Sequence, residues 1–322
     1  MSKKYVGIDI GGTNLKAGVV DETGTLLSAA KTPLQFTTPE AFVETLAGLS
    51  RQAAEAAGIG AEEICAVGMG VPGEVDTEHG TILYTCNIPL ADLPVGALFR
   101  RYLDVPVYLE NDANCAALAE YWAGAGKGCH SLIVVTLGTG VGAGIVLGGK
   151  LLRGINGTAG EAGHMVVEPD GVPCRCGRRG CWEQYASANA LKRITREAME
   201  RCPDSALWVH CAGKLEQISG RSAFQVAREC GDETAQAVCR SYVRYLALGV
   251  VNLINLFQPD VLCIGGGVSN EADEALLHPL QRIVQQERFG HDPRRTAKVV
   301  KAELGNDAGL IGAALLGRME TK

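Results

Sequence analysis

The sequence predicts an α/β fold arranged as two lobes, and three observations support this prediction. The chain has 322 residues, which exceeds one domain of roughly 100–200 residues. Helical patterns alternate with buried strands, as is typical of a parallel sheet. A strand, a glycine-threonine turn and a second strand occur near the start of the chain and again near its middle, which indicates a duplicated architecture.

The composition excludes several classes of protein. With 47% hydrophobic and 20% charged residues, the chain resembles a globular protein, and no apolar run reaches the roughly 20 residues that span a bilayer. We therefore expect a cytoplasmic protein without a membrane partner. The formal net charge of −6 lacks the basic excess that phosphates attract, so no nucleic-acid partner is expected. Most of the twelve cysteines, such as Cys65, Cys115 and Cys263, look like small buried hydrophobic residues, as in a reducing compartment.

The first thirty residues read as a β-meander with a glycine turn. Asp9 ends the first predicted strand, and the turn that follows has a bare backbone and a hydroxyl group that could meet phosphate oxygens. A hairpin of this composition without any ligand is the alternative. The residues of this turn are Gly11, Gly12 and Thr13.

A second glycine turn, which includes Gly138 and Thr139, follows the buried strand predicted over 132–137. The repetition favours a phosphate-bearing ligand held between the two turns, against the alternative of two unrelated hairpins. A third glycine turn follows the strand predicted over 260–264 and could lie against a flat ring or a sugar. A tight connection from strand to helix explains that third turn equally well, and its residues are Gly265, Gly266 and Gly267.

Other elements follow from periodicity and capping residues. Thr38 and Pro39 begin a helix predicted over 39–58, and the run 64–71 is a buried strand. Residues 74–94 are expected to form a loop, in which Asn87 could contact a ligand or serve as an ordinary turn residue. Residues 202–220 are expected to be irregular and match no pattern with a known role. Further helices and strands are expected over 145–147, 187–199, 232–256, 299–302 and 307–318.

Asp112 stands where a strand predicted over 105–110 meets a helix predicted over 116–122. A carboxylate at the carboxyl edge of a sheet is well placed to face a crevice. The alternative is that Asn111 or Asp112 caps the helix by accepting from its first N–H groups. The residues alone leave both readings open.

One short stretch predicts a metal site. His164, Cys174, Cys176 and Cys181 are ligands that suit tetrahedral Zn²⁺, and four of them close the coordination sphere, so the zinc is expected to be structural. Three glycines would let the backbone turn tightly round the ion. Three free cysteines beside an unrelated histidine are the alternative. The glycines are Gly171, Gly177 and Gly180.

These motifs together resemble the ROK family of sugar kinases and sugar-responsive repressors. The resemblance extends from residue 5 to about residue 318, and the run from the histidine to the cysteines is its most specific part. The matching segments are DIGGTN (9–14), ENDAN (110–114), GTGVG (138–142), EAGH (161–164), CRCGRRGCWE (174–183) and IGGGVS (264–269).

The resemblance implies an actin-like (ribonuclease H-like) ATPase fold, with each lobe a mixed sheet flanked by helices and a nucleotide and sugar cleft between the lobes. The smaller lobe would comprise residues 1–112 with the closing helix 306–322, and the larger lobe, with the zinc loop, residues 113–305. A homodimer is implied as well. The family's repressors carry an additional helix-turn-helix segment before the first motif, and its absence here argues for a kinase.

The resemblance also assigns roles. Asp112 would be the general base for phosphoryl transfer from ATP with Mg²⁺. The two glycine-threonine turns would hold the phosphates with Asp9 near the magnesium ion, and the third glycine turn would flank the adenosine. His164 would bind zinc through one nitrogen and the sugar through the other. The sugar contacts would be Asn111, Asp112, Glu161, His164 and Glu183, with Asn87 as a further contact.

The leading hypothesis is phosphorylation of the 6-hydroxyl of a hexose, with glucose converted to glucose 6-phosphate. One alternative is a kinase for another hexose, such as N-acetylmannosamine, N-acetylglucosamine, fructose or allose, because selectivity depends on loop shape. A sugar-sensing protein without turnover is the alternative from another class.

Overall fold

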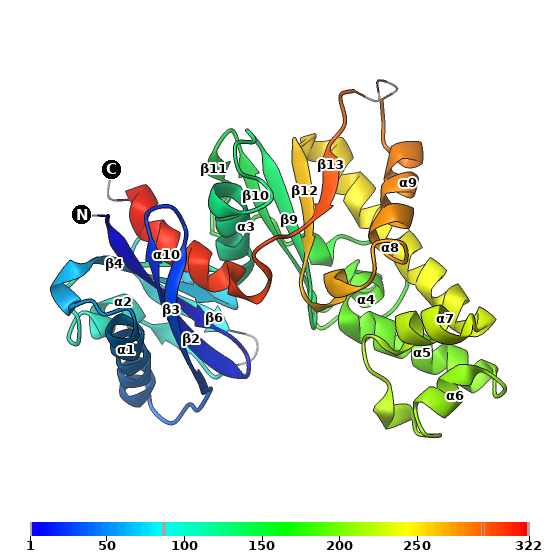
Figure 1. The fold of residues 1–322 in the computed structure, drawn as a ribbon, viewed down its shortest axis with the longest axis horizontal. Coiled ribbons are helices and arrows are strands. Elements are labelled where there is room, and N and C mark those ends of the chain that lie inside the picture. Colours follow the sequence, from blue (N-terminus) through cyan, green and yellow to red (C-terminus); the bar gives the residue numbers. More distant parts are fainter. Residues whose placement is uncertain (1, 86–87, 291, 293, 321–322) are drawn as a thin grey trace. The chain divides into compact units, whose positions relative to one another are not determined.

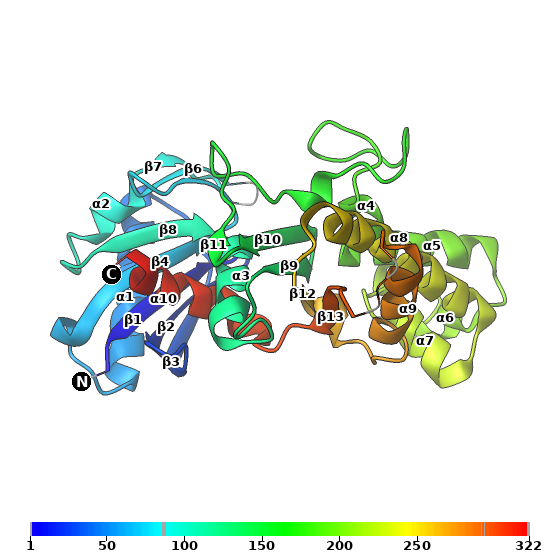
Figure 2. The same ribbon diagram turned by 90° about the horizontal axis from the view of Figure 1, so that it is seen from above.

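The computed structural model describes residues 2–85, 88–290, 292 and 294–320, whose helices and strands are shown in Figures 1 and 2. The chain forms two compact units. Unit 1 comprises Met1–Val134, Gly144–Gly160 and Glu303–Lys322, and unit 2 comprises Val135–Ala143 and Glu161–Ala302. The predicted lobes, 1–112 with 306–322 and 113–305, stay a prediction, because this division describes compactness and not independent motion.

The main sheet of unit 1 confirms the predicted meander. Its strands lie in the order β3-β2-β1-β4-β8, with β1, β2 and β3 antiparallel and β4 and β8 parallel to β1. The predicted strand at 105–110 therefore pairs in parallel with the predicted strand at 64–71. The bounds are β1 (Lys4–Ile10), β2 (Asn14–Asp21), β3 (Leu26–Pro33), β4 (Ile64–Val71) and β8 (Val107–Asn111).

Successive side chains of a strand point to opposite faces of the sheet. Both faces of this sheet carry apolar side chains, and helices cover both. Val6 and Ile8 belong to the core that contains the buried side chains of α1 (Pro39–Ala56), whereas Tyr5 belongs to the core of α10 (Ala308–Glu320). The predicted cap of α1 is confirmed, since the Thr38 hydroxyl accepts from Ala41 N at 3.2 Å.

Backbone packs directly against backbone where α10 meets the sheet and α3 (Asp112–Ala123). A Cβ atom on Gly68 of β4 would overlap the carbonyl oxygen of Ala313 in α10. A Cβ atom on Gly312 of α10 would likewise overlap the carbonyl oxygen of Cys115 in α3. Glycine is therefore required at these positions by close approach, and α3 is held firmly within unit 1.

The prediction of a loop over 74–94 was wrong for most of that segment. Three short antiparallel strands form a separate sheet in the order β5-β6-β7, and Val75, Ile82 and Leu93 turn into the core. The strands are too short and too polar for a clear alternation. Asn87 lies outside the described residues. The bounds are β5 (Gly73–Asp76), β6 (Thr81–Thr85) and β7 (Ala91–Leu93), followed by α2 (Val95–Phe99).

The second five-stranded sheet repeats the arrangement of the first. Its order is β11-β10-β9-β12-β13. The first strand, β9, thus has β10 and β11 on one side and β12 and β13 on the other, as β1 has β2 and β3 on one side and β4 and β8 on the other. As in the first sheet, the last two strands are parallel to each other. This confirms the predicted duplication of the architecture. The bounds are β9 (Leu132–Leu137), β10 (Val141–Leu147), β11 (Lys150–Leu151), β12 (Val261–Gly265) and β13 (Lys298–Lys301).

Helices predominate in unit 2. The predicted helix over 232–256 is α8, and the Asp232 carboxylate caps it by accepting from Ala235 N at 2.8 Å. The expectation of irregular structure over 202–220 was wrong in part, because α6 buries Leu207 in a small core with Met199. The helices are α4 (Glu183–Ala186), α5 (Ala188–Arg201), α6 (Ala206–His210), α7 (Ser222–Cys230), α8 (Glu233–Phe257) and α9 (Leu277–Glu287), with short 3₁₀ turns at Ala61–Glu63, Leu215–Gln217 and Gly305–Asp307.

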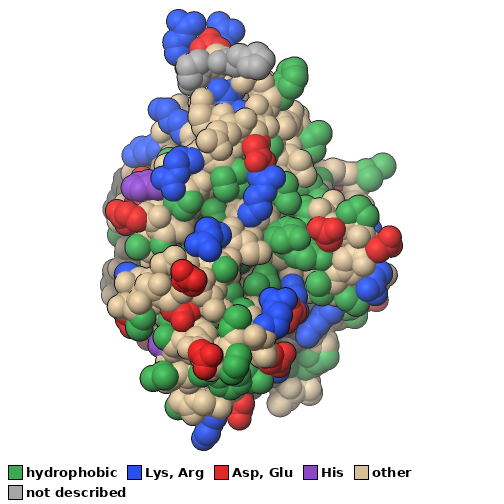
Figure 3. Space-filling view, turned by 90° about the vertical axis from the view of Figure 1, so that its right-hand side faces the viewer, with side chains coloured by type: hydrophobic (Ala, Val, Ile, Leu, Met, Phe, Trp, Pro, Cys, Tyr) green, Lys and Arg blue, Asp and Glu red, His purple; other side chains and the backbone are tan. Residues whose placement is uncertain are grey.

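Among the described helices, α8 alone is long and apolar enough to cross a membrane by length and composition. Its most apolar window is 61% buried inside the structure, and α4, α5, α7 and α9 pack around it. This burial is that of a core helix. On the side of the structure that carries α5, α6 and α7, acidic and basic side chains are interspersed without a large field of one sign (Figure 3).

The close packing of α10 predicts opposite effects for two glycine substitutions. Gly68→Ala should lower the free energy of unfolding by about 2 kcal/mol or more, because the added methyl group overlaps backbone that has no room to move. The matched control is Gly48→Ala in α1, where nothing lies within 4 Å, and it should raise stability by about 0.5–1 kcal/mol. Urea denaturation measures both values, and equal effects would contradict the packing.

Candidate functional site

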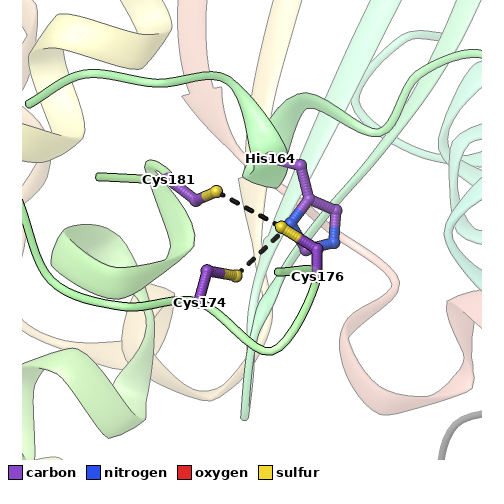
Figure 4. Close-up of side chains that lie close together, drawn as sticks. All are labelled: His164, Cys174, Cys176 and Cys181. Atoms are coloured by element: carbon purple, nitrogen blue, oxygen red, sulfur yellow. Dashed lines mark hydrogen bonds between the residues drawn. The ribbon is translucent and has the colours of Figure 1, made fainter. Parts of the chain in front are cut away.

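Four predicted metal ligands converge in unit 2. The side-chain ligand atoms of His164, Cys174, Cys176 and Cys181 all lie within 4.8 Å of one another (Figure 4). His164 Nδ1 lies 3.7 Å from Cys174 Sγ, and the sulfur atoms of Cys176 and Cys181 lie 3.6 Å apart. One nitrogen and three sulfurs this close together match the ligand set of a closed Zn²⁺ site.

Local backbone pairing produces this convergence. Isolated bridges join Val166 to Cys181 and Pro173 to Arg179, so the segment folds back on itself. Gly177 and Gly180 take the left-handed backbone conformation, with φ of 88° and 74°, which favours glycine. Gly171 lacks a positive φ, and its role is close contact, since a Cβ atom there would overlap the Tyr185 hydroxyl.

Burial and hydrogen bonding shift the pKa values of two cluster thiols in opposite directions. Burial, reinforced by the neighbouring thiols, raises the pKa of Cys181 to about 12, whereas a backbone N–H from Arg178 lowers the pKa of the exposed Cys176. Zinc binds thiolates and displaces their protons, so a bound ion would stabilise the charged form that burial opposes. The donor set of the segment is thus compatible with structural zinc.

Glu183 connects the metal cluster to the second glycine-threonine turn. One carboxylate oxygen of Glu183 accepts from Val141 N at 3.3 Å, and the other lies 3.7 Å from Cys174 Sγ. At the other end of the turn, Ala188 N donates to the carbonyl of Gly138 at 2.9 Å. The structure therefore brings Glu183, the predicted metal ligands and the predicted phosphate turn together within unit 2.

Aromatic anchors that the sequence did not reveal hold this segment against α8. Trp182 is fully buried and donates from its ring nitrogen to the carbonyl of Tyr245 at 2.8 Å. Tyr185 stacks on Tyr245 with ring centres 4.5 Å apart, and its hydroxyl accepts from Val172 N at 2.8 Å. These contacts left no signal in the sequence, because Trp182 and Tyr245 are 63 positions apart and each fits an ordinary apolar pattern.

The other two glycine turns are confirmed as tight turns. Gly11 N donates to Asn14 O at 3.0 Å, and Thr13 is exposed. Gly266 has a φ of 83°, and a Cβ atom there would lie 2.6 Å from backbone atoms of Leu137. Both turns leave exposed backbone at strand ends, and their contacts with phosphate and adenosine stay predictions. The 3₁₀ turn that begins at the third glycine spans Gly267–Asn270.

Asp9 lies at the end of β1 and faces the first turn of α10. Burial raises the pKa of the Asp9 carboxyl, while Lys16 opposes this effect and Asp307 adds to it. A Cβ atom on Gly309 would lie 3.3 Å from an Asp9 carboxylate oxygen, which places the carboxylate beside the start of α10. A cation near Asp9, such as the predicted Mg²⁺, would favour the ionised form.

Asp112 is the first residue of α3 and is exposed. Asn111 precedes it as the helix cap, and its side-chain oxygen accepts from Ala113 N and Asn114 N at 2.9 and 3.3 Å. The capping alternative therefore holds for Asn111. Asp112 Oδ1 also accepts from Ala113 N at 2.8 Å, so its carboxylate is oriented at the carboxyl end of β8.

A buried network that the sequence analysis missed lies directly behind these residues. Glu110 is 1% exposed and pairs with Arg153 Nε at 2.6 Å. It also accepts from Asn111 N and from the side-chain amide of Asn114, both at 2.9 Å. The partners Glu110 and Arg153 are 43 positions apart, so spacing gave no signal for the pair. The remaining predicted sugar contact, Glu161, is exposed and precedes the 3₁₀ turn Ala162–His164.

The family is established by comparison with known proteins. A model of the ROK family matches residues 5–320. The chain belongs to the ROK family. This ROK protein is 42% identical over 315 residues to a glucokinase of Streptomyces coelicolor, with 97% of each chain covered. It is 36% identical over 313 residues to a glucokinase of Thermotoga maritima, with 97% and 96% covered.

Solved structures agree with this assignment. The structure of a ROK family glucokinase from Streptomyces griseus in complex with glucose and AMPPNP matches with a TM-score of 0.83 and 40% identity, covering 98% of this chain and 99% of that one. The predicted fold class is confirmed: this ROK protein has an actin-like (ribonuclease H-like) α/β fold with mixed sheets flanked by helices.

The metal cluster predicts that the protein holds about one zinc ion per chain and that Cys176→Ser loses it, because a serine hydroxyl is a poor zinc ligand. Metal analysis of purified protein measures the content. Cys202→Ser, which changes an exposed cysteine outside the cluster, is the matched control and should retain zinc. Equal zinc content in the two variants would contradict the assignment.

Proposed function

We propose that the protein transfers the γ-phosphoryl group of ATP to the 6-hydroxyl of glucose. The observation that carries this proposal is 40% identity over 98% of the chain to a ROK glucokinase whose structure holds glucose and AMPPNP. Relatives that are N-acetyl-D-glucosamine kinases match at 32–33% identity, below the 42% of the Streptomyces coelicolor glucokinase. Glucose is therefore the preferred hexose.

Asp112 is the proposed general base. As the sugar O6 forms its bond to the γ-phosphorus, the bond from that phosphorus to the bridging oxygen of ADP breaks, and the O6 proton passes to the Asp112 carboxylate. The carboxylate is exposed and oriented by Ala113 N at 2.8 Å, and the start of α3 favours its negative charge. A base of this kind contributes typically 10²–10⁴-fold to the rate.

The phosphates are proposed to lie on the two glycine-threonine turns. Exposed Thr13 and Thr139 would supply hydroxyl donors, and the bare glycine backbone would allow close approach. Asp9 is proposed to face the Mg²⁺ that accompanies ATP and neutralises charge as the phosphoryl group moves. The remaining backbone contacts would come from Gly11, Gly12 and Gly138 for the phosphates and from Gly265, Gly266 and Gly267 for the adenosine.

The sugar is proposed to be bound by carboxylates and an imidazole. Carboxylates suit vicinal hydroxyl groups because each oxygen accepts hydrogen bonds. His164 Nδ1 faces Cys174 Sγ, so zinc would occupy Nδ1 and leave the Nε2 hydrogen as an oriented donor to the sugar. The proposed contacts are Asn111, Asp112, Glu161, His164 and Glu183, with Asn87 as a further contact.

Three organisational features complete the proposal. The lobes 1–112 with 306–322 and 113–305 are proposed to be the bodies that bind sugar and nucleotide together. The protein is proposed to act as a homodimer in the cytoplasm, without a nucleic-acid or membrane partner. Size-exclusion chromatography with light scattering tests the dimer.

The assigned base predicts a specific loss of activity. Wild-type protein with ATP, Mg²⁺ and glucose should release ADP, and Asp112→Asn should lower kcat by roughly 10²–10⁴-fold, because the amide accepts no proton. The control is Asp204→Asn, an exposed carboxylate far along the chain in unit 2, which should keep the wild-type rate. A coupled assay for ADP measures all three. An active Asp112→Asn variant would refute the role, and no ADP from wild type with any hexose would refute the function.

A further inference from the structure

The buried carboxylate of Glu110 occupies an unusual place in unit 1. It is the residue before Asn111 and Asp112, at the carboxyl end of β8, and it is 1% exposed. Buried carboxylates are rare unless they are paired, because removing the charge from water is costly. A buried charge two residues before the proposed reacting carboxylate of Asp112 therefore needs a physical explanation.

Both oxygens of this carboxylate are held by donors. Oε2 accepts from Arg153 Nε at 2.6 Å, and Oε1 accepts from the backbone N–H of Asn111 at 2.9 Å. Asn114, one turn into α3, donates its side-chain amide to Oε1 at 2.9 Å. Charge-assisted hydrogen bonds of this length are among the strongest in proteins, so the peptide between Glu110 and Asn111 is fixed from the side chain as well as from the strand.

The Glu110 carboxylate determines the orientation of the Asn114 side-chain amide. The Asn114 side chain is 2% exposed, and its Oδ1 atom is buried without a hydrogen-bond partner among the described residues. Turning the amide over would set that oxygen against the Glu110 carboxylate, where two acceptors repel, and would lose the hydrogen bond from the amide. The interaction with Glu110 is thus strong enough to leave a buried acceptor unpaired.

Arg153, the partner of Glu110, also contacts a second segment, the loop over residues 153–159. It follows β11, and its carbonyl accepts from Ala159 N at 3.0 Å, which closes a loop containing Gly154 and Gly157. Two residues after Ala159 the chain reaches Glu161, a proposed sugar contact. One ion pair within unit 1 therefore fixes the segment that carries Asn111 and Asp112 and the base of the loop that leads to Glu161.

We propose that Glu110 and Arg153 are positioning residues for phosphoryl transfer, which hold the Asp112 carboxylate and the Asn111 amide in reacting geometry. The proposal rests on the proposed function. The ion pair touches neither sugar nor nucleotide in this assignment and acts through the backbone of residues 110–112. A misplacement of about 1 Å of a reacting group can lower a rate by about 10²-fold, so loss of the pair should appear mainly in kcat.

The test compares kcat, KM and melting temperature for Glu110→Gln, Arg153→Lys and the double variant. We expect kcat to fall by about 10–100-fold in each single variant, because both lose the fixed geometry of the charged pair. The double variant should fall no further than the worse single variant, since the two residues act as one unit. KM for ATP should stay within twofold of wild type.

A matched control separates positioning from stability. Glu120, in α3, is a second buried carboxylate of unit 1. It is 0% exposed and accepts from the backbone N–H groups of Ala125, Glu303 and Leu304. Glu120→Gln should lower the melting temperature and leave kcat within twofold of wild type at 25 °C. A merely structural role for Glu110 would give the same result for Glu110→Gln.

Arg153→Ala gives a second readout. Guanidinium chloride at millimolar concentration should restore part of its kcat, at least fivefold, whereas sodium chloride at the same ionic strength should not, because only guanidinium replaces the planar donors. The proposal would be overturned if Glu110→Gln and Arg153→Lys kept the wild-type kcat. It would also be overturned if Glu120→Gln lost as much kcat as Glu110→Gln for the same drop in melting temperature. Inactive wild-type protein would instead refute the proposed function.

Discussion

Four metal-ligand atoms within 4.8 Å of one another constrain the chain between Glu161 and Glu183. Such a segment has little regular structure of its own, and without a cross-link its backbone would have many conformations to lose on ordering. The bridges at Cys181 and Arg179 and the buried Trp182 hold its ends, while the cluster closes its middle. Glu183 directly follows Trp182 at the end of this segment, and its carboxylate accepts from Val141 N. In this account the proposed zinc ion orders the sugar contacts and takes no part in the transfer.

In unit 1, buried contacts instead of a metal cluster hold the backbone that carries Asp112. Close backbone contact between α10 and both the sheet and α3 leaves α3 little freedom, and the Glu110–Arg153 pair fixes the turn from which α3 starts. In unit 1, the proposed functional side chains of Asp9 and Asp112 thus lie at the carboxyl ends of β1 and β8, which a rigid interior holds. The two sheets share one strand order, and their first turns carry the same glycine-threonine pattern, on which we propose that the phosphates lie.

Sequence reasoning succeeded where the signal was local. Thr38 predicted the start of α1, Asp9 and the glycines predicted the first turn, and the four ligands predicted their own convergence. Sequence reasoning failed where an element or contact depends on residues that are far away along the chain. The sheet at residues 73–93 is stabilised by core contacts of very short strands, and the small core of α6 depends on Met199 and Val226 from neighbouring helices. Arg153 and Tyr245 gave no signal, because their partners lie far away along the chain.

We propose that the metal cluster organises sugar binding while the chemistry occurs at Asp112. Calorimetric titration of the Asp112→Asn variant with glucose, before zinc removal, after removal with a chelator and after zinc is restored, tests it most directly. We expect the variant to bind glucose without turnover, with an affinity that falls at least tenfold when zinc is removed and recovers when zinc is restored. Unchanged glucose affinity in zinc-free protein would show that the metal cluster does not organise the sugar site.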